Sequence, residues 1–122
     1  MSDVTTTVDT YLSAWNETDP QRRAGLVEQV WAADGTLTDP PMAASGRAGI
    51  SDLHAALQDQ FPGHSFRRSS AVDAHHDRFR VGWELVGPDG TVALAGLDVG
   101  ELTEDGRLRA VTGFFGDLPA AG

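Results

Sequence analysis

The sequence predicts an α+β fold in which three N-terminal helices pack on one face of a strongly curved antiparallel sheet. Two observations lead to this fold class. Apolar residues recur at helical spacing in the first half of the chain, and from His64 onward they tend to alternate with polar ones, as in half-buried strands. Because the helices come first and the strands follow as a run, the order is that of an α+β domain rather than of alternating α/β units.

The first two helices are expected at about residues 4–16 and from Asp19-Pro20 to about Asp34-Gly35. In the first, apolar residues that include Tyr11 form one stripe, which a packed helix buries. In the second, aspartate caps the N-terminus, and proline fits the first turn because no helical hydrogen bond needs its missing N–H. The buried face of the second helix is supplied by Leu26, Val27, Val30 and Trp31.

A short strand and a third helix follow. Residues 36–39 are too few for a helix and are closed by Pro40-Pro41, so they are expected to form a strand that leads into a turn. The third helix opens at Ser45-Gly46 and ends at Pro62-Gly63, with His54 on or beside its apolar face. That face is formed by Ile50, Leu53, Leu57 and Phe61.

The second half of the chain predicts three consecutive long strands. The first, around residues 79–85, alternates Phe79, Val81, Trp83 and Leu85 with outward-facing residues. A turn at residues 87–90 leads to a strand at 91–102, and a turn at 104–106 leads to one at 108–115. Hairpins join neighbouring strands in opposite directions, so the sheet is expected to be antiparallel. The whole chain, residues 1–122, is expected to be one domain.

Composition narrows the classes of function. The 122-residue chain has nine Arg, no Lys and 18 acidic residues, which gives a net charge of −9. This charge repels nucleic acid and anionic membranes, so neither is an expected partner. Without Lys there is no Schiff-base chemistry, and without Cys there is no thiolate nucleophile. The N-terminus lacks a basic leader with an apolar run, which favours a soluble cytoplasmic protein.

Three residues are candidates for chemistry. Asp98 interrupts an apolar strand between Gly96 and Gly100, and it faces either water or the interior, where the glycines would leave room for a ligand. Asp39 precedes two prolines, where aspartate commonly forms a local Asx turn. Tyr11 lies on a buried helical stripe and fits a core position with a satisfied hydroxyl. From the residues alone, the structural and the functional interpretation of each stay open.

Taken together, these residues belong to a wider pattern. It comprises residues 11–15, 34–40, Gly46-Arg47 with Ile50, 97–99, 105–108 and Phe114-Phe115. Through these segments, nearly the whole chain resembles the ketosteroid isomerases and SnoaL-like polyketide cyclases of the nuclear transport factor 2 (NTF2-like) superfamily. The resemblance implies a single NTF2-like domain with a cone-shaped fold, and a pocket between the sheet and the helices.

The resemblance also implies roles for individual residues. As in steroid isomerases, Asp39 would be the base that moves a proton, and Tyr11 and Asp98 would donate hydrogen bonds to the enolate oxygen. His54 stands where some of these enzymes have a further tyrosine, and it would either relay a proton or pack in the core. If the cyclases are the better comparison, Asp98 itself takes the role of the base.

The resemblance leaves other functions open. Dehydratases of this fold combine His, Asp and Tyr, which this chain also has, whereas epoxide hydrolases need an arginine where Gly96 stands. A non-catalytic module that binds a small molecule or assembles with a partner is the alternative to an enzyme. The residues His75-His76 are adjacent on an expected strand, so they should point to opposite faces and hold no metal.

The hypothesis is therefore a cofactor-independent acid/base enzyme that isomerises, cyclises or dehydrates a small apolar carbonyl compound. No cofactor and no metal are expected. Relatives of this kind commonly pair through the exposed face of the sheet, so a homodimer is expected. The predicted pocket is lined by Trp15, Leu57, Phe61, Trp83, Gly96 and Phe115.

Overall fold

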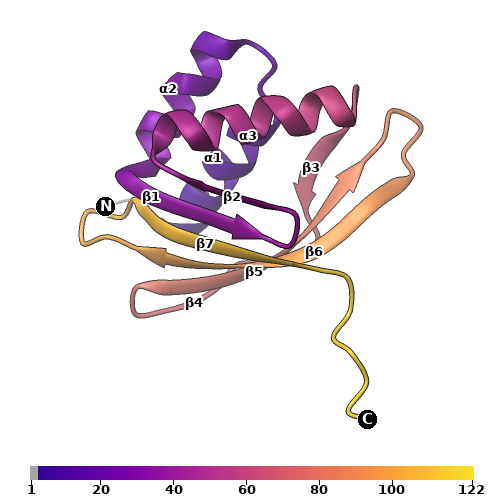
Figure 1. Ribbon diagram of the computed structural model, residues 1–122. Coiled ribbons are helices and arrows are strands. Elements are labelled where there is room, and N and C mark those ends of the chain that lie inside the picture. The colour runs from indigo at the N-terminus through magenta and orange to yellow at the C-terminus, as the bar shows by residue number, and fades with distance from the viewer. Residues whose placement is uncertain (1–2) are drawn as a thin grey trace.

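A computed structural model describes residues 3–122, which form three helices and seven strands (Figure 1). The helices lie together on one side of a curved sheet. The strand order in the sheet is β2-β1-β7-β6-β5-β3, and β4 pairs with β5. The elements are α1 (Val4–Asn16), α2 (Pro20–Val30), β1 (Trp31–Asp39), β2 (Met42–Ser45), α3 (Arg47–Gln60), β3 (Ser65–Arg68), β4 (Asp73–His75), β5 (Arg78–Val86), β6 (Val92–Leu102) and β7 (Leu108–Phe115).

The helices begin where the sequence predicts, but α2 ends earlier. The Asp19 carboxylate accepts a hydrogen bond from the Arg22 N–H at 2.9 Å, as expected of a helix cap. The predicted end of α2 near Asp34 is wrong, because the chain leaves the helix at Val30 and Trp31 begins β1. The Arg47 guanidinium donates two hydrogen bonds, of 3.0 and 2.8 Å, to the Trp31 carbonyl. That contact comes from α3 and fixes the start of β1.

The sheet is mixed, and this corrects the expectation of a purely antiparallel sheet. Strands β5, β6 and β7 are antiparallel neighbours, as their hairpin turns predict. Strand β1, however, runs parallel to β7, with Leu37 opposite Val111 and Thr38 opposite Thr112. Turns fix only the pairing of strands that follow one another, and β1 reaches β7 through tertiary packing.

Three short strands lie outside the pattern that periodicity detects. Strand β2 forms a hairpin with β1, and β3 and β4 both pair with β5. Each has only three or four residues, too few to show an alternation of two. Their pairing completes the curved sheet around the edge of the helical layer (Figure 1).

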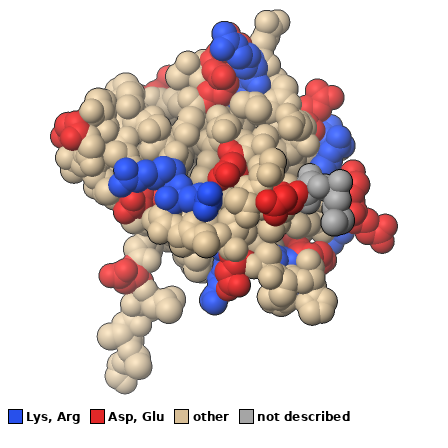
Figure 2. Space-filling model, turned by 180° about the vertical axis from the view of Figure 1, so that it is seen from behind, with Lys and Arg blue, Asp and Glu red and all other residues tan. Residues whose placement is uncertain are grey.

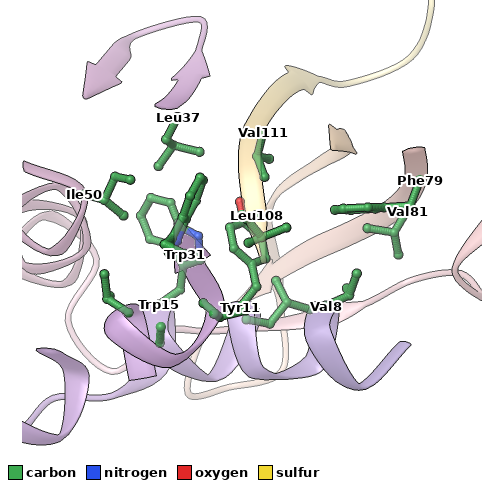
Figure 3. Packing of buried hydrophobic residues seen from close by; sticks show 14 residues of the cluster. Val8, Tyr11, Trp15, Trp31, Leu37, Ile50, Phe79, Val81, Leu108 and Val111 are labelled. Atoms are coloured by element: carbon green, nitrogen blue, oxygen red, sulfur yellow. The ribbon is translucent and has the colours of Figure 1, made fainter. Parts of the chain in front are cut away.

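The core lies between α1, α3 and the concave face of the sheet. Figure 3 shows Trp31 at its centre, with Ile50 and Leu37 on the side of α3 and β1. Val8, Tyr11 and Trp15 of α1 pack from below in the same view, which confirms the predicted stripe. Gly35 makes room for this arrangement, since a Cβ there would lie 2.5 Å from the Trp31 ring. Among residues 3–122, no helix is both long and apolar enough to cross a membrane.

Candidate active site

A pocket opens beside this core, between α1, α3 and the sheet. Its free space of about 30 Å³ holds no more than a few water molecules. Every strand of the sheet except β4 contributes a lining residue. The lining residues are Tyr11, Leu12, Trp15, Asp39, Met42, Leu57, Phe66, Trp83, Leu94, Asp98 and Phe115.

Asp98 lies at the inner wall of this pocket and points into the protein. Its side chain is on the same face of β6 as the buried Gly100, and the residue is only 6% exposed. The Tyr11 hydroxyl donates a hydrogen bond of 2.9 Å to Asp98 Oδ2, and Trp83 Nε1 donates one of 3.0 Å to Oδ1. Both carboxyl oxygens therefore accept a buried hydrogen bond, which is the arrangement that stabilises a carboxylate.

The surroundings of Asp98 bring its titration close to neutral pH. Burial raises the pKa of Asp98 to about 6, although the hydrogen bonds from Tyr11 and Trp83 oppose the rise and the charge of Asp39 adds to it. Burial and the adjacent Asp98 charge raise the pKa of Tyr11 well above its ordinary value. Tyr11 therefore remains a hydrogen-bond donor, while Asp98 can both accept and release a proton near pH 7.

Asp39 combines the two interpretations that its sequence position left open. Its Oδ1 accepts a hydrogen bond from the Met42 N–H at 3.2 Å, so it forms the local turn that aspartate favours before two prolines. It also lines the pocket, and partial burial raises its pKa. A turn residue at the end of β1 thus brings a second carboxyl group to the site.

Gly113 of β7 separates the two carboxyl groups. It is opposite Asp98 in the β6–β7 pairing and next to Thr112, which pairs with Thr38 of β1. A Cβ on Gly113 would lie 3.0 Å from Asp98 Oδ1 and 3.1 Å from the Asp39 Cβ. The absence of a side chain here lets both acids approach the same side of the sheet.

His54 lies behind the pocket rather than in its lining. It is fully buried, and its ring stacks on Trp15 with the ring centroids 3.9 Å apart. Neither ring nitrogen has a hydrogen-bond partner among residues 3–122. Burial, reinforced by the Arg23 charge, lowers the pKa of His54 to about 3, so the ring is neutral at pH 7. No contact links it to Asp98 or Asp39 as a proton relay would require.

Four of the six residues predicted to line the pocket do so: Trp15, Leu57, Trp83 and Phe115. Gly96 does not, because the Trp83 ring lies over it and fills the room that the glycine was expected to leave for a ligand. Phe61 ends α3 and packs edge-on against His64, with the centroids 5.4 Å apart.

Sequence reasoning missed the hydrogen bond from Trp83 to Asp98. A signal for it existed, because alternation in β5 directs Trp83 inward and the hairpin pairs it with Gly96, two residues from Asp98. Such diagonal neighbours are within reach of a long side chain. The lining residues Leu12, Met42, Phe66 and Leu94 were also missed, and those in short strands carried no periodic signal.

The adjacent histidines also differ from expectation. His75 ends β4, but His76 lies in the following turn with a φ of 52°, so the two rings meet with their Nδ1 atoms 3.0 Å apart. The prediction that they point to opposite faces is therefore wrong. Both are exposed, and residues 3–122 contain no group of three or more side chains suited to bind a metal ion.

Comparison with known proteins identifies the family. The SnoaL-like domain family matches residues 8–111. A candidate isomerase of the SnoaL-like family from Agrobacterium tumefaciens strain C58 is 39% identical, with 92% of this chain and 96% of that chain covered and a TM-score of 0.88. No protein of curated function matches the sequence.

More distant structures share the fold. A candidate SnoaL-like polyketide cyclase from Jannaschia sp. CCS1 is 17% identical, covers 94% of this chain and 89% of its own, and has a TM-score of 0.70. An NTF2-like protein of unknown function from Exiguobacterium sp. 255-15 is also 17% identical, with coverage of 92% and 99% and a TM-score of 0.72. Because the family model matches residues 8–111 of the 122, the chain belongs to the SnoaL-like family.

Proposed function

We propose that this SnoaL-like protein is an acid/base enzyme that moves a proton on a small carbonyl compound bound in the pocket. The observation that carries the proposal is Asp98, a buried carboxyl group with a pKa of about 6 in a largely apolar pocket. A general base works best when its pKa is close to the working pH. The related candidate isomerase and candidate cyclase also favour proton-transfer chemistry.

We assign the role of base to Asp98 rather than Asp39. Tyr11 and Trp83 each donate a hydrogen bond to Asp98, which favours the carboxylate over the neutral acid that an oxyanion donor would need to be. The Asp98 carboxylate takes a proton from the carbon next to the carbonyl. The electron pair of the C–H bond forms a carbon–carbon double bond, and the π pair of the carbonyl moves to its oxygen, which gives the enolate. The proton then returns to the same carbon or to a conjugated one.

Tyr11 and Asp39 complete this assignment. The Tyr11 hydroxyl, which donates to Asp98 in this structure, turns towards the developing enolate oxygen when the carbonyl compound binds. Asp39 approaches from the other side of Gly113 and serves as the second proton carrier. The small free space favours a compact compound over a steroid, which would have to displace several lining side chains.

The test is hydrogen exchange at carbon, which requires no knowledge of the final product. Small cyclic ketones and enones are incubated with the protein in D₂O, and deuterium uptake next to the carbonyl is followed by proton NMR. We expect Asp98→Asn to slow the catalysed exchange on the order of 100-fold or more, the usual contribution of a general base. The exposed Asp59→Asn serves as the matched control and should leave the rate unchanged.

Each alternative predicts a different result in the same assay. If Asp39→Asn abolishes exchange while Asp98→Asn retains it, Asp39 is the base, as the steroid isomerase comparison implies. If the wild-type protein exchanges none of the compounds yet binds them, a non-catalytic binding module becomes the better hypothesis.

We also propose that a second copy of the chain covers the outer face of the sheet. Phe114 of β7 is 55% exposed and Val99 of β6 is 39% exposed, both on the face opposite the helices. Phe114 is paired with Leu97, which extends this apolar surface across the two strands. Light scattering at micromolar concentration should give the mass of a dimer, and Phe114→Glu should give that of a monomer.

A further inference from the structure

The charge of the pocket is of one sign. Its ionisable lining residues are Asp39, Asp98 and Tyr11, and the others that line it carry no charge. Among residues 3–122, Asp39 is the charged residue that acts on Asp98, and its effect is repulsive. The two carboxyl groups of the pocket therefore have no cationic side chain to offset them.

Two arginines of a neighbouring groove already have acidic partners. Arg67 and Arg68 line a neighbouring surface groove, where Arg67 pairs with Glu84 at 3.0 Å and Arg68 pairs with Asp9 at 2.8 Å. Figure 2 shows the same interspersion of arginine and acidic side chains over the back of the molecule. With a net charge of −9, the chain as a whole adds to the negative potential.

The pocket wall is aromatic. Trp15, Phe66, Trp83 and Phe115 form a continuous row with successive ring centroids 5.4, 5.4 and 5.6 Å apart. Their planes are steeply inclined to one another, at 59°, 77° and 84°, so the edges of some rings meet the faces of others along the row. Ring faces carry partial negative charge and attract cations, most strongly when water is excluded.

We infer that this pocket binds its ligand through a small organic cation, such as a protonated amine or a quaternary ammonium group, and discriminates against anions. Two carboxyl groups and an aromatic wall without a cationic side chain are the combination that recognises such a group. The inference concerns the same pocket as the proposed function and narrows its substrate to a carbonyl compound that bears a positive nitrogen.

In the proposed reaction, the positive nitrogen of the substrate would also stabilise the enolate. Removal of a proton next to a carbonyl group places negative charge on the oxygen, beside the carboxyl groups of Asp39 and Asp98. No side chain of the pocket carries a positive charge to offset it. A positive nitrogen in the substrate would supply that charge within the same molecule.

Binding requires the pocket to widen, because its free space of about 30 Å³ is smaller than an ammonium group with three methyl substituents. Phe115 is the lining residue best placed to move. It ends β7, is 36% exposed, and is followed by Gly116 and an irregular C-terminal segment that leaves the sheet (Figure 1). The aromatic wall can therefore open at its outer end while Asp98 stays in place.

The test compares three molecules of nearly the same shape and different charge. Choline carries a quaternary nitrogen, 3,3-dimethylbutan-1-ol has carbon in its place, and 3,3-dimethylbutanoate is an anion. Each is titrated at constant ionic strength, and the indole N–H resonances of the tryptophans report binding. Trp15 and Trp83 line the pocket, whereas Trp31 lies in the core and serves as the internal control.

We expect choline to bind about tenfold more tightly than the neutral alcohol, the scale of a desolvated cation–π contact, and the anion to bind weakest. Asp98→Asn should reduce this preference, whereas Asp59→Asn should keep it. Phe66→Leu should weaken the binding of choline more than that of the alcohol. This variant tests the aromatic wall without changing either carboxyl group. The inference is wrong if the alcohol binds as tightly as choline, if the anion binds best, or if choline shifts Trp31 as much as Trp15 and Trp83.

This result is independent of the exchange assay. Deuterium uptake by neutral ketones without a preference for choline would leave the proton-transfer proposal standing and reject the cationic ligand. A preference for choline that depends on Asp98, without exchange of any ketone, would support the cationic ligand and reject the proton-transfer proposal.

Discussion

Asp98 and His54 are both buried and titratable, and both lie close to Trp15, yet they differ in every respect that matters for chemistry. Asp98 shares the pocket with Trp15 and has a hydrogen bond on each carboxyl oxygen. His54 stacks on the Trp15 ring and has no hydrogen bond on either nitrogen. The pKa of Asp98 moves to about 6, close to neutrality, and that of His54 moves to about 3, away from it. A shifted pKa therefore marks a reactive group only when partners and access accompany it.

The largest expected effect is on the stability of the protein in acid. Between pH 6.5 and 3, the unfolded chain protonates His54 whereas the folded protein keeps it neutral, so the residue lowers the free energy of unfolding as the pH falls. His54→Phe, which keeps a stacked ring, should raise that free energy by about 3 kcal/mol more at pH 4 than at pH 7.5. Urea unfolding at both pH values measures the difference.

The difference between the two pH values separates the protonation of His54 from the packing of its ring. Poor accommodation of the larger phenylalanine ring at position 54 would lower stability at both pH values alike and leave the difference intact. An equal effect of His54→Phe at the two pH values would mean that His54 protonates normally in the folded protein.

The effect of Asp98 on the free energy of unfolding is the next largest, and it has the opposite pH dependence to that of His54. Because the pKa of Asp98 is raised on folding, its ionisation costs stability above pH 6, and this cost disappears as the pH falls towards the ordinary value of 3.8. Asp98→Asn should therefore stabilise the protein by about 2 kcal/mol at pH 7.5, somewhat less than the full cost because bonds to a neutral amide are weaker. At pH 4 we expect little change, and a loss of stability at pH 7.5 would contradict the assigned pKa shift.

The smallest effect concerns the partners of Asp98. Trp83→Phe removes the indole N–H that donates to Oδ1 and should raise the pKa of Asp98 further above 6. Tyr11→Phe should act in the same direction through Oδ2, and the free energy of unfolding should fall by about 1–2 kcal/mol at pH 7.5 in either variant. Carbon-detected NMR titration of the Asp98 carboxyl group gives the pKa directly. An unchanged pKa would show that these bonds do not hold the carboxylate.

The sequence predicted the elements whose side chains repeat regularly. Spacing, together with capping and turn residues, located α1, the start of α2, most of α3 and the three long strands β5, β6 and β7. It extended α2 too far because Trp31 continues the helical spacing of Val27 and Val30. The contact that ends the helix there comes from Arg47, which is distant in the sequence.

The site was harder to predict than the fold. Residues on both faces of β6 are apolar, with Leu97 and Val99 on one side and Leu94 and Leu102 on the other, so periodicity gave no direction for Asp98. Periodicity also placed His54 on an apolar face without showing whether that face looks towards the pocket or away from it. These directions are set by the pairing of strands and the packing of helices on the sheet, which only the complete fold specifies.

The parallel pairing of β1 with β7 has a consequence for how the protein is made. During synthesis, β1 leaves the ribosome before most of the sheet, and its parallel partner β7 is the last strand of this sheet to appear. Asp39 is carried by β1, and the glycine that separates it from Asp98 is carried by β7. The two carboxyl groups therefore cannot be brought together before β7 has emerged, which places the assembly of the pocket late in the folding of this domain.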